Sequence, residues 1–288
     1  MTSSLNRYEV DESRPLDPVT LHILTVVNRV ANDLNVPYIV VGATARDLLL
    51  FHVFGIPVTR ATADVDFAVA VDTWERFLHL REALFESGEF SEGKIEHRLF
   101  LNASPSTEQI PVDLIPFGGI ADRDLIHWPP DWETVMTVAG FDDAMAAAVH
   151  VKVNSSLTIP VASLAGLTVL KLFAWFDRQT SDKDALDLFR IISTYADAGN
   201  LDRLYGNEIR FMEEASYDIE LAGAKLLGFD AHRICHAETL TKLRSLLSPE
   251  TVIERLAERI RLSRFPLQPE QLPRLLSVLL GFAERLMQ

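Results

Sequence analysis

The stretch between Tyr38 and Val71 constrains the fold more than any other part of the sequence. It begins with an apolar run that stops at Gly42, continues with a helical pattern as far as Phe54, and ends in a second apolar run. Short apolar runs rich in β-branched residues indicate buried strands, and the pattern between them indicates a helix. The sequence therefore predicts a strand, a glycine turn, a helix and a second strand.

Two aspartates, Asp64 and Asp66, lead into the second of these strands. Residues at positions i and i+2 point to the same face of a strand. The two carboxylates can therefore converge on one point, and oxygen-rich clusters of this kind bind Mg²⁺. Together with the glycine turn, the aspartate pair favours phosphate chemistry. A third acid, Asp113, lies within a later apolar run and needs a partner, because an unpaired buried charge is costly.

Composition limits the class of protein. The chain of 288 residues is 48% hydrophobic and can bury a large core, and its length favours two lobes. No apolar stretch approaches ~18 uncharged residues, which argues against a membrane span. The N-terminal segment is polar and acidic and lacks the apolar core of a secretory signal. The single cysteine, Cys235, can form no internal disulfide, so we expect a cytoplasmic protein with no membrane partner.

The net charge of −14 is concentrated in residues 1–198, and residues 199–288 are nearly neutral. A protein that binds nucleic acid through phosphates usually has a basic face. Only the C-terminal part could supply such a face, and its candidates are Arg255, Arg259, Arg261 and Arg264. A solvated helix face is the alternative interpretation of this cluster.

The order of the patterns predicts an α/β (α+β) fold, in which a mixed sheet with flanking helices precedes a helical C-terminal lobe. Residues 1–17 are expected to be a flexible lead-in, residues 18–198 the first domain and residues 199–288 the helical lobe. Residues 116–145 are expected to be irregular. Breaks in the helical lobe are predicted at Gly228, Ser248–Pro249 and Phe265–Pro266. The other helices and strands are predicted at Leu21–Leu34, Trp74–Leu84, His97–Asn102, Ile110–Ile115, Ala146–Val153, Leu157–Val161, Leu164–Arg178 and Asp182–Tyr195, with residues 103–107 as the turn of a hairpin.

Gly42, the Asp64/Asp66 pair and Asp113 together resemble the signature of the nucleotidyltransferase fold, also called the DNA polymerase β-like fold. The segments Gly42–Arg46 and Arg60–Phe67 are similar to the first half of the AbiEii-type nucleotidyltransferase toxins. The second half of that family pattern is matched by Lys171, Ala174, Arg178, Lys183, Asp184, Asp187 and Leu188. The resemblance extends from Leu34 to Ala196 and leaves the helical lobe unassigned.

The resemblance implies a site for a nucleoside triphosphate (NTP) and for Mg²⁺ or Mn²⁺. It implies that the metal ligands and catalytic acids are Asp64, Asp66 and Asp113, with two metals or with Asp113 as the base. The residues that it implies for nucleotide binding are Gly42, Ala43, Thr44, Arg46 and Lys171.

Three positions carry alternatives, namely Ala43, Arg46 and Asp184. Ala43 stands where the family usually has Gly or Ser, so a phosphate contact there would come from Thr44 or from backbone N–H groups. Arg46 would bind phosphate or pair with an acid in the core. Lys171 would bind the triphosphate as a point charge, and the catalytic acid Asp184 would position Lys171 or act on the acceptor. Asp187 is expected to be a structural support.

The implied function is transfer of NMP from an NTP to an acceptor. By resemblance, this would be the toxin of a toxin–antitoxin pair, with tRNA or another RNA as acceptor and a cognate antitoxin as partner. A small-molecule acceptor, as in aminoglycoside nucleotidyltransferases, is the first alternative, and the acidic net charge favours it because it attracts cations. A nucleotide-sensing or partner-binding protein without turnover is the second, and the intact carboxylates count against it.

Overall fold

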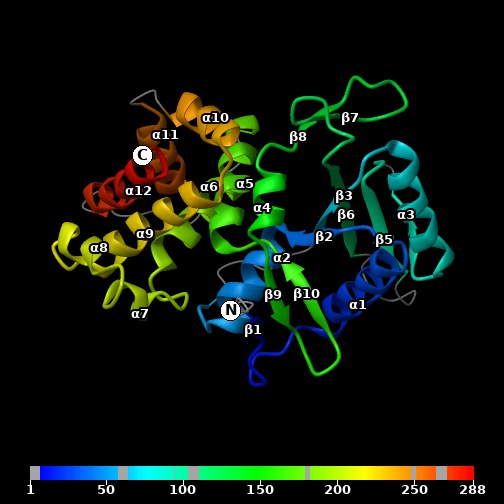
Figure 1. Ribbon diagram of the computed structural model, residues 1–288, viewed down its shortest axis with the longest axis horizontal. Coiled ribbons are helices and arrows are strands. Elements are labelled where there is room, and N and C mark those ends of the chain that lie inside the picture. The colour runs from blue at the N-terminus through cyan, green and yellow to red at the C-terminus, as the bar shows by residue number, and fades with distance from the viewer. Residues whose placement is uncertain are drawn as a thin grey trace. The chain divides into compact units, whose positions relative to one another are not determined.

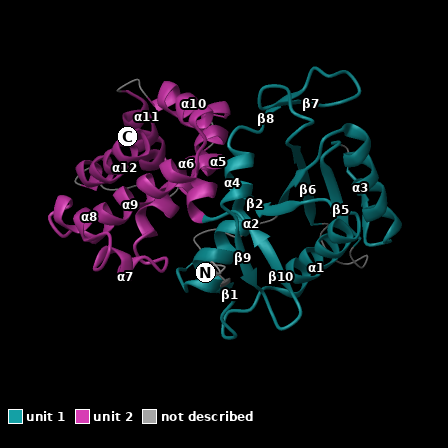
Figure 2. Ribbon diagram, in the orientation of Figure 1, with its two compact units in different colours: residues 1–163 teal, residues 164–288 magenta. Residues whose placement is uncertain are grey.

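The computed structural model describes residues 7–57, 64–93, 95–102, 110–178, 182–247, 251–263 and 271–288. The chain divides into two compact units, unit 1 (residues 1–163) and unit 2 (residues 164–288), shown in different colours in Figure 2. The division falls before α5 (Leu164–Asp177), whereas the sequence places it near residue 198. The reason is that α5 and α6 (Asp182–Thr194) pack against the helix α9 (Ile219–Ile234).

Unit 1 is built on a mixed sheet (Figure 1), whose described part has eight strands in the order β1-β9-β10-β2-β3-β6-β5-β4. The strands are β1 (Arg7–Glu9), β2 (Tyr38–Val41), β3 (Val65–Ala70), β4 (Phe90–Glu92), β5 (Arg98–Leu101), β6 (Pro111–Phe117), β9 (Val149–Lys152) and β10 (Thr158–Val161). Strand β3 runs antiparallel to β2 and parallel to β6, and β5 runs antiparallel to β6. This arrangement, together with the helical unit 2, confirms the predicted class of fold.

The helices α1 (Pro18–Asp33) and α3 (Trp74–Glu86) pack against each other (Figure 1). Each starts at a side-chain cap that satisfies free backbone N–H groups. Asp17 accepts hydrogen bonds from the N–H groups of Val19 and Thr20, and Thr73 accepts one from Arg76. The cap of α3 is therefore Thr73.

The central strands β2 and β3 contribute fully buried side chains to the core of unit 1. Ile39, Val40, Phe67 and Ala68 have no exposed surface. After β2 the chain turns at Gly42 into the short helix α2 (Gly42–Asp47), which continues as a π-helical segment, η1 (Leu48–Val53). The helix ends near Gly55, as the sequence predicts, and Gly55 takes a left-handed φ of 73°.

The stretch 116–145 is more regular than expected. It contains a second, two-stranded sheet of β7 (Leu125–His127) and β8 (Val135–Thr137), and the helix α4 (Phe141–Ala146). These short strands follow no clear alternation of apolar residues, which is why the pattern misses them. Part of the expected lead-in forms β1, which pairs with β9, and residues 1–6 lie outside the described residues. The predicted turn at residues 103–107 also lies outside them.

Unit 2 is helical in its described part. Besides α5, α6 and α9, it contains α7 (Leu201–Leu204), α8 (Ile209–Glu214), α10 (Ala237–Leu247), α11 (Thr251–Leu262) and α12 (Leu272–Leu286). The predicted break at Gly228 is wrong, because α9 continues through it. A Cβ at this position would lie 2.2 Å from the carbonyl oxygen of Phe282, so the glycine allows α9 and α12 to pack closely. The breaks predicted at Ser248–Pro249 and Phe265–Pro266 lie outside the described residues.

In the described part of the chain, no helix combines the length and the apolar character that a membrane crossing would need.

Candidate functional site

The register of three strands brings the predicted acids of unit 1 together. Asp66 on β3 lies opposite Asp113 on β6, and Asp113 lies opposite Arg98 on β5. Residues directly opposite one another share a face of the sheet, so the three side chains form a row. Asp64 lies two residues before Asp66 and joins the row. One ligand oxygen from each of Asp64, Asp66 and Asp113 lies within 4.8 Å of the others.

Gly42 lies beside this carboxylate cluster, defined as Asp64, Asp66 and Asp113. A Cβ at position 42 would lie 2.0 Å from Oδ2 of Asp66. Gly42 also has a φ of 68°, which L side chains rarely adopt. The turn therefore requires glycine for two reasons, its backbone conformation and its close approach to a carboxylate.

The first turn of the helix after Gly42 holds one residue of the cluster in place. The hydroxyl of Thr44 donates a hydrogen bond of 2.9 Å to the backbone carbonyl of Asp64. Ala43 and Thr44 are both buried. The Arg46 side chain is only 5% exposed, and its Nη2 lies 2.7 Å from Oδ1 of Asp47. Thr44 thus positions Asp64. Arg46 pairs with an acid, as expected if it has a structural role instead of binding phosphate.

Arg98 is a residue of this site that the sequence interpretation missed. Its Nε and Nη2 donate hydrogen bonds of 2.7 Å and 2.6 Å to the two carboxylate oxygens of Asp113. The hydrogen bonding of the Arg98 guanidinium to the Asp113 carboxylate is the main cause of its raised pKa, and the charges of Asp64 and Asp66 also contribute. The buried Asp113 was expected to need a partner, but the register in which β5 pairs with β6 could not be read from the sequence.

The donor set fits a hard divalent cation. Three carboxylates supply only oxygen ligands, which Mg²⁺ and Mn²⁺ prefer. Arg98 balances one of the three negative charges, so the cluster keeps an excess of negative charge. The missing side chain of Gly42 is what allows the Asp66 carboxylate to lie against the turn.

The predicted residues of unit 2 form a separate ion-pair network. Nζ of Lys171 on α5 lies 3.1 Å from Oδ1 of Asp184 and 2.8 Å from Oδ2 of Asp187, both on α6. Arg178 lies 3.0 Å from the other oxygen of Asp184. The two aspartates share a helix face because they are three residues apart. Both are buried, and the Lys171 side chain is 15% exposed.

The proposed basic face on α11 is largely neutralised. Arg259 lies 3.6 Å from Asp182, and Arg261 makes an ion pair of 2.6 Å with Glu258. Arg264 lies outside the described residues. The pairs with acids support the interpretation of this surface as a solvated helix face.

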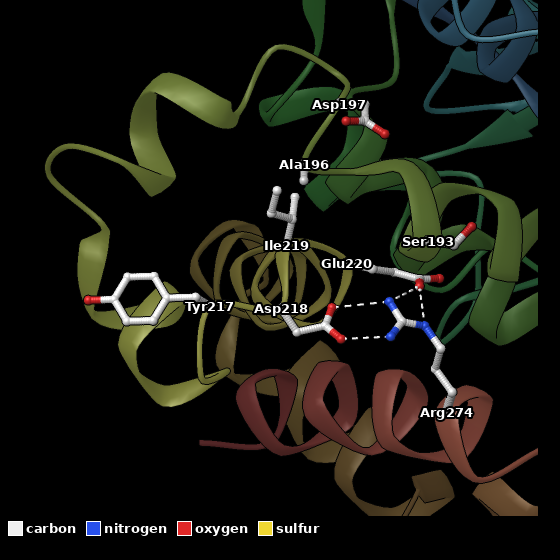
Figure 3. A pocket seen from close by; sticks show the side chains of 8 residues that line it. All are labelled: Ser193, Ala196, Asp197, Tyr217, Asp218, Ile219, Glu220 and Arg274. Carbon is white, nitrogen blue, oxygen red and sulfur yellow. Dashed lines mark hydrogen bonds and ion pairs between the residues drawn. The ribbon is translucent and has the colours of Figure 1, made fainter.

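Unit 2 also has a surface pocket of about 490 Å³ that none of the predicted site residues lines (Figure 3). One lining residue, Arg274, reaches from α12 to two acids at the start of α9. The contacts are 2.8 Å to Oδ2 of Asp218 and 2.9 Å to Oε2 of Glu220. The charges of Arg274, Asp218 and Glu220 thus satisfy one another at an exposed surface.

The sheet with an aspartate pair after a glycine turn, and a third aspartate on the neighbouring strand, is the site architecture of a nucleotidyltransferase. The family model described as "Nucleotidyl transferase AbiEii toxin, Type IV TA system" matches residues 26–244. The chain belongs to this family of nucleotidyltransferase toxins of type IV toxin–antitoxin systems. The predicted family and class of enzyme are thereby confirmed.

Several solved structures are also similar. A nucleotidyltransferase-like antigenic protein from Paracoccidioides brasiliensis is 17% identical, with a TM-score of 0.43 over 72% of this chain and 94% of that one. The antibiotic-resistance factor ANT(2'')-Ia is 13% identical, with a TM-score of 0.39 over 70% and 99%. The Thermotoga maritima CCA-adding enzyme in complex with tRNA is 14% identical, with a TM-score of 0.26 over 95% and 82%. No inference about substrate rests on similarities of this size, and no curated protein sequence matches the chain significantly.

Proposed function

We propose that this protein is a cytoplasmic enzyme that transfers NMP from an NTP to RNA, with tRNA as the acceptor, in a reaction that requires Mg²⁺ or Mn²⁺. The observation that carries the proposal is the carboxylate cluster, whose oxygens lie within 4.8 Å of one another beside the turn at Gly42. A cognate antitoxin is the partner that membership of the family implies.

The transfer forms one P–O bond and breaks another. The acceptor hydroxyl attacks the α-phosphorus of the NTP, and the bond between the α-phosphorus and the pyrophosphate oxygen breaks. When bound, a divalent cation would neutralise the triphosphate and polarise the α-phosphate. Asp64 and Asp66 are the residues that would hold it. Asp113 accepts the proton of the acceptor hydroxyl or serves as a further ligand.

The remaining residues bind and orient the nucleotide. The turn at Gly42 has no side chain, which lets Asp66 lie against it, and backbone N–H groups of Ala43 and Thr44 are the donors that such a turn offers to phosphate. Lys171 binds the triphosphate as a point charge. Asp184 holds the Lys171 ammonium at 3.1 Å and so positions it for this role.

A cationic small molecule is the second candidate acceptor, because the net charge of −14 attracts cations and repels RNA. The two acceptors are separated by incubating the protein with each labelled NTP and Mg²⁺, and with purified tRNA, total RNA or an aminoglycoside. Label on RNA from one NTP is expected, and it should disappear with Asp66→Asn. Label only on the aminoglycoside would identify a small molecule, and not RNA, as the acceptor. No label on any acceptor would contradict the proposed activity.

The toxin role has its own test, which is growth after induction. Expression of the wild-type chain should stop growth, and expression of Asp66→Asn at the same level should not. Equal growth of the two strains would show that toxicity does not depend on the transferase activity.

A further inference from the structure

We propose that Arg98 is a built-in cation of the carboxylate cluster. By holding Asp113, Arg98 limits the nucleotide-free protein to one bound divalent cation. A second cation at Asp113 then requires the guanidinium to withdraw. The inference rests on the proposed metal-dependent function and adds a residue that neither the family match nor the sequence interpretation assigns.

The first support is the geometry of the pair. Arg98 contacts both oxygens of Asp113, at 2.7 Å and 2.6 Å, in the fork arrangement that makes guanidinium–carboxylate pairs strong. One of these oxygens also lies within 4.8 Å of ligand oxygens from Asp64 and Asp66. The guanidinium therefore engages the Asp113 oxygens that a second metal ion would need as ligands.

The second support is the balance of charge. The three carboxylates carry three negative charges, and Arg98 leaves two, which a single divalent cation neutralises. A second divalent cation beside Arg98 would leave the site strongly positive. Like charges at this range repel strongly in a partly buried site, so the second cation would have to enter together with an anionic triphosphate or displace Arg98.

The third support is that Arg98 is placed to move, whereas Asp113 is not. The Asp113 side chain is 10% exposed and lies on an inner strand of the sheet, between β3 and β5. The Arg98 side chain is 30% exposed and lies on β5, near the end of the sheet. A long, partly exposed side chain can leave the carboxylate without any change in the strands.

The test is Mn²⁺ binding to the nucleotide-free protein, measured by calorimetry and by the electron paramagnetic resonance of free Mn²⁺. Wild type should bind one equivalent. Arg98→Gln should bind the first equivalent about tenfold more tightly and take up a second, because a positive charge has been removed from the site. Arg98→Lys keeps the charge and should resemble wild type. The matched control is Arg14→Gln, which removes the guanidinium of another ion pair of unit 1, with Asp11, and should change nothing.

Arg98→Gln leaves a buried carboxylate without its partner and could unfold. A second pair of variants avoids this by comparing Asp113→Asn with the double variant Asp113→Asn/Arg98→Gln. The double variant should bind Mn²⁺ about tenfold more tightly than the single one, because only the single variant keeps the guanidinium beside Asp64 and Asp66. Thermal unfolding supplies an independent readout, since Mn²⁺ should raise the melting temperature of Arg98→Gln more than that of wild type.

The outcomes are distinguishable. Equal or weaker Mn²⁺ binding after removal of Arg98, in both comparisons, would overturn the inference and leave Arg98 as a residue that only orients Asp113, while the proposed function would stand. Failure of wild type to bind Mn²⁺, with or without nucleotide, would instead overturn the proposed metal-dependent function itself.

Discussion

The carboxylate cluster of unit 1 and the ion-pair network of unit 2 use the same kinds of side chain with opposite charge balance. In unit 1, three carboxylates converge, and the cation Arg98 is paired with one of them, Asp113. In unit 2, two cations, Lys171 and Arg178, contact two carboxylates, Asp184 and Asp187. The first group has an excess of negative charge, and the second is balanced.

The difference shows how the chemistry is divided. A cluster with excess negative charge stabilises itself by binding cations from solution, so it suits a metal site. A balanced network stabilises itself internally and holds its lysine in one place. Neutralising one acid should therefore relieve the first group and damage the second.

The largest effect is expected from the acids of the cluster. Asp64→Asn or Asp66→Asn should lower the rate of NMP transfer by about 10³-fold, because the electrostatic stabilisation supplied through these ligands is lost. The rate is measured with labelled NTP, and circular dichroism checks that each variant keeps its fold. Transfer at the wild-type rate in either variant would remove that residue from the site.

Gly42→Ala tests the close approach between the turn and Asp66. The new Cβ would lie 2.0 Å from Oδ2 of Asp66, so the carboxylate must shift, and we expect transfer to fall by about 10²-fold. Gly88→Ala is a matched control, because Gly88 has a similar φ of 76° and a Cβ there would meet nothing within 4 Å. Both variants should lose about 1 kcal/mol of stability from the left-handed backbone, but only Gly42→Ala should lose activity. A similar loss of activity in Gly88→Ala would assign the effect to stability.

The two groups should respond to neutralisation of an acid with opposite signs. Asp187→Asn removes a partner at 2.8 Å from the Lys171 ammonium and should lower the free energy of unfolding by about 2 kcal/mol. Asp64→Asn relieves repulsion among three carboxylates and should raise it by about 1 kcal/mol when no metal is present. The free energies of unfolding of both variants are measured by urea titration in the presence of a chelator. Changes of the same sign would contradict the difference in charge balance.

Lys171→Ala examines whether the balanced network serves the reaction. If Lys171 binds the triphosphate, the variant should need about tenfold more NTP for half-maximal rate, which corresponds to one weak charged contact. Lys171→Arg should restore the function only partly, because a planar guanidinium replaces a compact ammonium. The measurement is the rate as a function of NTP concentration. An unchanged curve for Lys171→Ala would make the residue purely structural.

The smallest effect is expected on α11. Replacing Arg255 and Arg259 by Glu should lower labelling of RNA by about threefold at moderate salt and flatten its salt dependence, since few phosphate contacts are lost. Arg259 already has an acidic neighbour, Asp182, at 3.6 Å, which limits its contribution. NTP binding, measured separately, should not change. A loss as large as that of Asp66→Asn would show that α11 is a principal RNA-binding surface.

Much of this protein was predictable from local patterns. The strand, glycine turn and helix around Gly42, and the placement of Asp64 and Asp66 on one face, follow from the period of a strand and from the conformational freedom of glycine. The signals are local because each depends on residues a few positions apart. The capping residue Thr73 and the helical character of unit 2 were predictable for the same reason.

Contacts between segments distant in the sequence were decided by tertiary packing. Arg98 meets Asp113 because β5 and β6 pair in one register, and a slip by one residue would turn either side chain to the other face. Gly228 looks like a helix break from sequence, yet it lies within α9 because a neighbouring backbone, at Phe282, occupies the space of a side chain. Register and close packing depend on the partner segment as much as on the residue itself. Local sequence therefore determined that Asp64 and Asp66 share one face, and the assembled sheet determined that Asp113 and Arg98 join them.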